Sequence, residues 1–139
     1  MLMLIRNPKF FYIFLTISAL FLFTGCQLLR PMISDMKIGT EVDEETMEIT
    51  KKADTFSGKT DTIYASILLK NAPENTELEA TWTREGREIS EKSTISTSGT
   101  RYIAFNMQKP SENFRSGKYA VKIKIKGTDK ELSKEFEIK

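Results

Sequence analysis

The chain has 139 residues, of which 29% are charged and 40% are hydrophobic, a length and composition typical of one folded globular domain. It contains no histidine and one cysteine. These counts exclude an intrachain disulfide, a Cys/His zinc site and every catalytic scheme that depends on an imidazole.

The small positive charge of the chain belongs to its N-terminal leader. Lys and Arg number 21, against 19 Asp and Glu. Residues 1–25 contain two of the basic residues, Arg6 and Lys9, and none of the acidic ones, which leaves 19 of each sign in the rest. A nucleic-acid partner requires a clustered excess of Lys and Arg, so no nucleic-acid binding is expected.

Residues 1–25 have the order of a secretory signal peptide. A short basic start precedes an uncharged run of 14 residues, Phe10–Phe23. A membrane-spanning helix needs about 20 apolar residues. The shorter run suits the helical apolar core of a signal peptide that is cleaved from the mature chain.

The sequence Phe23–Cys26 that closes the leader resembles the lipobox of bacterial lipoproteins. In that family the signal peptidase cuts directly before the cysteine. The thiol carries a diacylglycerol, and the amine usually carries a further fatty acid such as palmitate. The resemblance implies cleavage between Gly25 and Cys26, lipidation of Cys26, and a stable membrane anchor outside the cytoplasm. The alternatives are an uncleaved anchor and a secretory peptide with a coincidental cysteine.

Gln27 bears on which membrane holds the anchor. In lipoproteins of bacteria with two membranes, an Asp directly after the lipidated cysteine often acts as a signal for retention in the inner membrane. The Gln at this position therefore favours the outer membrane in such a host. In a host with one membrane, the resemblance places the protein on the outer face of that membrane.

Residues 26–55 are predicted to form a lipidated tether and an acidic segment that holds the first strand or strands. Met36–Val42 alternates apolar and polar residues, as a short strand does. Five carboxylates lie within Glu41–Glu48, but they lack the spacing of a calcium loop, so no metal site is expected. The pattern leaves open whether residues 41–48 form a strand or a linker.

Residues 56–139 alternate in the manner of short strands separated by turns. The predicted strands are 61–70, 76–84, 89–97, 102–109, 117–126 and a last strand ending at Ile138. The predicted turns and loops are Asn71–Asn75, Arg84–Arg87, Ser98–Gly99, Pro110–Ser116 and Gly127–Lys130. Six or seven strands at spacings near ten residues predict a β-sandwich or a small barrel.

The order of landmarks in residues 56–139 resembles an immunoglobulin-like or fibronectin-III-like domain. Trp82 corresponds to the core Trp on the third strand, and Gly117–Tyr119 resembles the tyrosine corner that opens the penultimate strand. The resemblance implies an all-β, antiparallel sandwich of about seven strands without the inter-sheet disulfide. A fold of this kind says nothing direct about function.

An exposed apolar face is the strongest candidate for a binding site. Tyr64 and Leu68 point outward from one predicted strand, and Tyr102 points outward from the strand expected beside it. Aromatic residues are enriched at the centres of protein interfaces, so Tyr64, Leu68 and Tyr102 are predicted to bind a partner. The alternative is that the segment Met36–Ile49 folds over this face and covers it.

Two other groups of residues are weaker candidates. Four lysines, Lys118, Lys122, Lys124 and Lys126, point outward from one strand, but Glu residues of the flanking strands are expected to match them in charge. The loops at the ends of the sandwich, Asn71–Asn75 and Pro110–Ser116, could contact a ligand. Phe114 in the second loop would equally well fill the bottom of the core.

The function that these residues favour is binding without catalysis. No base is placed to activate a Ser or Thr, and no glycine-rich phosphate loop follows a strand. No cofactor is expected. The sequence predicts a lipid-anchored module that contacts another protein of the bacterial cell envelope. The alternatives are binding of a small molecule or glycan through the end loops, and a passive structural role.

Overall fold

The structure is a computed structural model that describes residues 30–139. The predicted signal peptide, with its cleavage site at Gly25 and Cys26, lies outside the described residues. Within residues 30–139 every regular element is a strand, so the prediction of an all-β fold is confirmed. This part of the chain has no helix that could cross a membrane.

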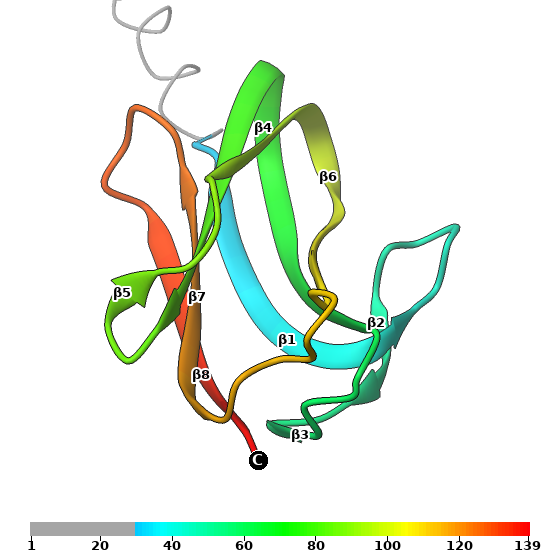
Figure 1. The fold of residues 1–139 in the computed structure, drawn as a ribbon. Coiled ribbons are helices and arrows are strands. Elements are labelled where there is room, and N and C mark those ends of the chain that lie inside the picture. Colours follow the sequence, from blue (N-terminus) through cyan, green and yellow to red (C-terminus); the bar gives the residue numbers. More distant parts are fainter. Residues whose placement is uncertain (1–29) are drawn as a thin grey trace, which may run out of the picture. The chain divides into compact units, whose positions relative to one another are not determined.

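Eight strands form one sheet that curls into a half-barrel (Figure 1). Their bounds are β1 Met32–Val42, β2 Ile49–Lys52, β3 Thr55–Phe56, β4 Thr62–Arg84, β5 Arg87–Glu88, β6 Ser93–Gln108, β7 Gly117–Ile125 and β8 Glu131–Ile138. The strand order is β2-β1-β4-β7-β8-β3, and both β5 and β6 pair with β4.

The strand β4 explains the curl, because its 23 residues run through both halves of the sheet. We call these halves the two layers: one contains β1, and the other contains β7 and β8. Its first half pairs with β1, from Tyr64 to Lys70. Its second half pairs with β7, from Leu78 to Arg84. The long strand β6 accompanies β4 on the other side over both halves. Figure 1 shows both strands turning at the same end of the molecule.

The turn in β4 lies at the predicted break Asn71–Asn75. Asn71 has φ 56° and Asn75 has φ 62°, values in the left-handed region that Asn tolerates better than most residues. The pairing with β6 shifts register on both sides of Ala72. The prediction of a loop between two strands is therefore wrong: the chain makes a bulged bend inside one strand.

The prediction that all strands run antiparallel is also wrong, because the sheet is mixed. The short strand β3 runs parallel to β8, with Phe56 opposite Ile138. The backbone N–H of Glu137 donates to Asp54 O, and that of Lys139 donates to Phe56 O. The parallel pair arises because the chain leaving β2 continues beside the last strand and runs in its direction. The sequence pattern of two residues, Thr55 and Phe56, is too short to predict it.

The core lies between the two layers and includes Ala72 of the predicted break, but most of it consists of apolar residues at alternate strand positions. From β4 these are Ile63, Ala65, Ile67, Leu69, Leu78, Ala80 and Trp82, all at most 1% exposed. The largest side chain, Trp82, meets Phe136 edge to face with ring centroids 6.1 Å apart. Tyr119 stacks on the same Phe136 ring at 5.3 Å.

Tyr119 also ties the start of β7 to the preceding loop. Its hydroxyl donates to the backbone O of Arg115 at 2.6 Å, four residues upstream. Burial raises the pKa of the Tyr119 hydroxyl, which therefore stays protonated as a donor. The bond closes the end of the core beside Phe114, which is 8% exposed.

The outer face of β4, β7 and β8 is matched in charge. Lys124 lies between Glu79 of β4 and Glu131 of β8, and Lys126 Nζ is 3.6 Å from Glu77 Oε2. Opposite charges on neighbouring strands contribute about 0.2–1 kcal/mol per pair. The row of lysines is thus part of a solvated surface on which positive and negative charges alternate between strands. The Glu residues of the flanking strands led to this expectation.

Candidate functional site

The candidate face lies on the outer side of β1, the first half of β4, and β6. On β4, Leu68 stands opposite Ser34 of β1 and opposite Tyr102 of β6. Directly opposed residues point to the same face of a sheet. The structure therefore brings Leu68 and Tyr102 together as a cross-strand pair, and both are half-buried.

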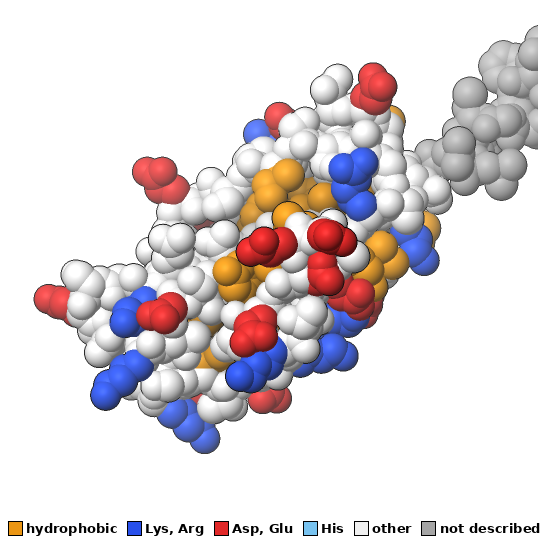
Figure 2. Space-filling view, turned by 90° about the vertical axis from the view of Figure 1, so that its right-hand side faces the viewer, with side chains coloured by type: hydrophobic (Ala, Val, Ile, Leu, Met, Phe, Trp, Pro, Cys, Tyr) orange, Lys and Arg blue, Asp and Glu red, His pale blue; other side chains and the backbone are white. Residues whose placement is uncertain are grey.

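Tyr64 lies further along the same face. It stands opposite Asn106 of β6 and Gly39 of β1, and Ser66 lies between it and Leu68. Tyr64 is half-buried, but it is not a direct neighbour of the Leu68–Tyr102 pair. Figure 2 views this side of the molecule, where hydrophobic side chains form a band bordered by acidic and basic ones.

The hairpin between β1 and β2 folds over the middle of this face. The Ser66 side chain is fully buried, and its Oγ donates to Met47 O at 2.9 Å. Ile49 is only 5% exposed. It packs against Gly39, where an added Cβ would lie 2.6 Å from Ile49 Cγ2 and would collide with the backbone O of Lys51. Glycine is thus required where the hairpin meets the sheet.

The acidic segment is the connection of this hairpin. Strand β1 ends at Val42 and β2 begins at Ile49. Asp43 Oδ1 accepts hydrogen bonds from the backbone N–H groups of Glu45 and Thr46, at 2.8 and 3.0 Å. These bonds lower the pKa of the Asp43 carboxyl. The carboxylate shapes a tight turn, and the open question of strand or linker resolves to a hairpin loop.

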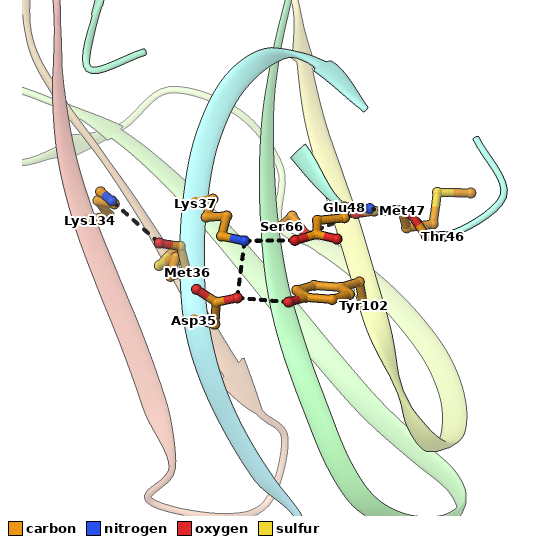
Figure 3. Close-up of polar contacts among 9 residues, drawn as sticks. All are labelled: Asp35, Met36, Lys37, Thr46, Met47, Glu48, Ser66, Tyr102 and Lys134. Atoms are coloured by element: carbon orange, nitrogen blue, oxygen red, sulfur yellow. Dashed lines mark hydrogen bonds and ion pairs between the residues drawn. The ribbon is translucent and has the colours of Figure 1, made fainter. Parts of the chain in front are cut away.

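A polar network fastens the hairpin to the candidate face (Figure 3). Lys37 Nζ lies 2.8 Å from Glu48 Oε1 and 3.2 Å from Asp35 Oδ2. The Tyr102 hydroxyl donates to Asp35 Oδ2 at 2.8 Å. Asp35 reaches this position because it sits in a bulge of β1 with φ 53°. The network connects β1, the hairpin and β6.

The pKa values in the network favour its bonded form at neutral pH. The Tyr102 hydrogen bond, and after it Lys37, lowers the pKa of Asp35. Hydrogen bonds to Glu48 and Asp35 raise the pKa of Lys37, and the Asp35 bond raises that of Tyr102. The ionised Asp35 carboxylate therefore contributes its full stabilisation above about pH 3.9, the pKa of Asp in the unfolded chain. The contribution is lost as the pH falls through the lower pKa of Asp35 in the folded protein. Lys37 and Tyr102 contribute below about 10.4 and 10 and lose that contribution as the pH rises.

We expect Tyr102→Phe to raise the pKa of Asp35 toward its ordinary value. The substitution keeps the ring beside Leu68 and removes the hydroxyl donor, which is the largest cause of the depression. Carboxyl NMR titration measures the change. The control is Tyr64→Phe, on the same face at a different register. An unchanged Asp35 pKa in Tyr102→Phe would contradict the network.

The end loops do not come together as one site. The bend at Ala72 pairs with Gly99, whereas the loop Pro110–Ser116 follows Gln108, which pairs with Thr62 ten residues away along β4. Beside that loop is an open pocket of about 500 Å³. Its lining includes Arg84, Ile89, Met107, Phe114, Arg115 and Tyr119.

Two of the polar side chains that line this pocket, Arg84 and Tyr119, bond to the protein itself. Arg84 donates from Nε and Nη2 to Ser116 O, at 3.1 and 2.8 Å. Phe114 and Tyr119 pack into the core. Beside this apolar surface the lining also holds exposed polar side chains, among them Glu112, Asn113 and Arg115.

Comparison of the sequence with models of known protein families finds no match, and a search of curated proteins finds no similar sequence.

Proposed function

We propose that this protein is a lipid-anchored, extracytoplasmic module of the bacterial cell envelope that binds another protein and catalyses no reaction. The anchor is Cys26, whose thiol is acylated before cleavage behind Gly25. The signal-peptide order of residues 1–25 and the Thr24-Gly25-Cys26 sequence support it. The outer membrane is the favoured location in a host with two membranes.

We further propose that residues 32–139 form an immunoglobulin-like sandwich. The pairing of β1 with the first half of β4, and of the second half of β4 with β7 and then β8, supports this fold. The buried Trp82 and the hydrogen bond from Tyr119 to Arg115 fit its landmarks. Modules of this architecture have many functions, so the binding role needs its own support.

The observation that carries the binding role is the open edge of β6 beside the Leu68–Tyr102 pair. Within residues 30–139, β6 pairs with β4 alone. The N–H of Lys109 donates to Asp61 O at 2.7 Å. The N–H and C=O groups of successive residues in an antiparallel strand point to opposite sides of the strand. The N–H of Lys109 points to β4, so the N–H and C=O groups of Tyr102, Ala104 and Asn106 point away from β4.

This edge lacks the features that usually prevent pairing. Natural edge strands carry charged residues, prolines or bulges that block an added strand. Residues 102–108 contain neither a charge nor a proline, and their pairing with β4 is regular. A partner that adds an extended strand here would gain backbone hydrogen bonds and would have Tyr102 as its direct neighbour. Long side chains of that strand would reach Leu68, which lies one strand further along the same face.

The test is in-cell crosslinking and pull-down of the full-length protein carrying Leu68→Glu. A carboxylate at the centre of an apolar contact should reduce partner recovery by more than about tenfold, since such residues contribute about 2 kcal/mol or more. The matched control is Ser133→Glu, which adds the same charge to the outer face of β8 opposite Lys122. Equal recovery with both variants would contradict the proposed face.

The second candidate function is binding of a small molecule or glycan, favoured by the pocket beside Pro110–Ser116. In that case, Leu68→Glu would leave binding intact. A substitution of Ile89, which lines the pocket and is 42% exposed, would remove it.

A further inference from the structure

The distance between the proposed anchor and the folded domain is short. Five residues, 27–31, separate Cys26 from the first residue of β1, Met32. A fully extended chain spans at most about 3.5 Å per residue. The start of β1 therefore lies within about 20 Å of a lipidated Cys26, so this end of the domain must stay close to the bilayer.

The structure shows which elements surround the start of β1. Met32 stands opposite Lys70, directly before the β4 bend. The bend pairs with Gly99 of β6. The turn between β7 and β8, at Gly127–Lys130, lies at the same end of the molecule (Figure 1). We name Met32, the bend Lys70–Asn75 and the turn Gly127–Lys130 the anchor end.

The anchor end is chemically suited to a lipid surface. Met32 is 52% exposed, more than the other large apolar residues exposed within residues 30–139, Ile89 and Met47. The bend and the turn carry both signs of charge: Lys70 and Lys130 beside Glu74 and Asp129. A surface of this kind is not repelled by anionic headgroups.

The other end of β1 leads into a segment with an excess of acidic residues. Strand β1 has 11 residues, and a straight strand rises about 3.3 Å per residue, so Val42 lies as much as about 30 Å from Met32 along this bulged strand. The hairpin that follows, residues 41–52, is acidic: its carboxylates are those of Glu41, Asp43, Glu44, Glu45 and Glu48, and its strand β2 carries Lys51 and Lys52, so five negative charges stand against two positive ones. The surface of an anionic bilayer repels such a segment.

We propose that the domain rests on the anionic bilayer with its anchor end and directs the acidic hairpin away from the lipid. This orientation rests on the proposed lipidation of Cys26. The lipid surface contacts Met32, the β4 bend and the β7–β8 turn. The edge strand β6 then stands upright on the membrane, with Tyr102 and Leu68 open to a partner approaching from the side.

The test uses four single-cysteine substitutions in the full-length protein, each of which replaces one exposed carboxylate. Glu74→Cys and Asp129→Cys lie at the anchor end. Glu45→Cys and Glu112→Cys lie at the other end and are the matched controls. Each variant is labelled with a thiol-reactive fluorophore and reconstituted into phosphatidylethanolamine–phosphatidylglycerol vesicles containing a nitroxide-headgroup lipid. Two positions per end keep the test valid if one variant misfolds.

We expect loss of fluorescence at positions 74 and 129 and no loss at 45 and 112. Mass spectrometry of the N-terminal peptide separately reports acylation of Cys26. An acylated protein with equal quenching at both ends, or with stronger quenching at 45 and 112, would overturn the orientation and leave the lipid anchor standing. An unacylated Cys26 would overturn the anchor and the orientation together.

Discussion

Replacement of Trp82 by Ala is expected to destabilise the fold by about 3–5 kcal/mol, the range for removal of a large buried aromatic side chain. Trp82 is 1% exposed and packs edge to face on Phe136. Phe136 also contacts Phe56 and Tyr119, so the cavity would open among the rings that join β3, β7 and β8. Denaturant unfolding followed by circular dichroism measures the loss.

Trp82→Phe is the matched control. Among the residues that the structure describes, Trp82 Nε1 is the buried side-chain polar atom without a hydrogen-bond partner, and an unmade bond of this kind is itself destabilising. Phe removes that N–H and keeps a ring against Phe136, so the loss should be smaller than for Ala. A change below about 1 kcal/mol in Trp82→Ala would contradict burial of this side chain.

Cys26→Ser is expected to abolish lipid attachment and to leave the precursor uncut. The resemblance to bacterial lipoproteins makes acylation of the thiol the step before cleavage. Cys26 is the only cysteine of the chain, so no other thiol can take the lipid. Metabolic labelling with a fatty acid, together with the mass of the N-terminal peptide, measures both effects.

Two outcomes would contradict the anchor. One is a Cys26→Ser protein that still matures at the same site. The other is a variant that loses its label but stays in the membrane after cleavage, because a single apolar contact such as Met32 cannot replace two or three acyl chains.

Alternation predicted the core well because it is a local property of a strand. In β7, the alternation that places Lys118, Lys122 and Lys124 outward places Tyr119, Val121, Ile123 and Ile125 inward, and these four are at most 3% exposed. The same reasoning identified Leu68 and Tyr102 as outward residues of neighbouring strands, and the structure pairs them.

The bends were not predictable in the same way. Asn71–Asn75 has the composition of a loop, yet β4 continues through it because β6 supplies a partner strand on the far side. Likewise, Ser98 and Gly99 suggested a turn, whereas β6 runs through both residues. Whether such a segment becomes a loop or a bulged strand depends on pairing with a strand that is distant in the sequence. The local sequence pattern carries no information about that partner.

The network around Asp35 was missed for a related reason. The alternation that predicts the first strand begins at Met36, but β1 begins at Met32 and includes Asp35. The bulge at Asp35 turns its carboxylate toward Tyr102, which is 67 residues away in sequence. Asp35, Lys37 and Glu48 carry no motif, and only the return of the hairpin over the face brings them together.

The passage of β4 and β6 through both layers has a consequence for local opening. Fluctuations that expose backbone amides to solvent usually involve contiguous cooperative units. Here neither layer is such a unit by itself, because Ile67 in one layer and Ala80 in the other belong to one hydrogen-bonded strand. The domain should therefore open as a single unit, and amides of both layers should exchange with solvent deuterium at the free energy of global unfolding.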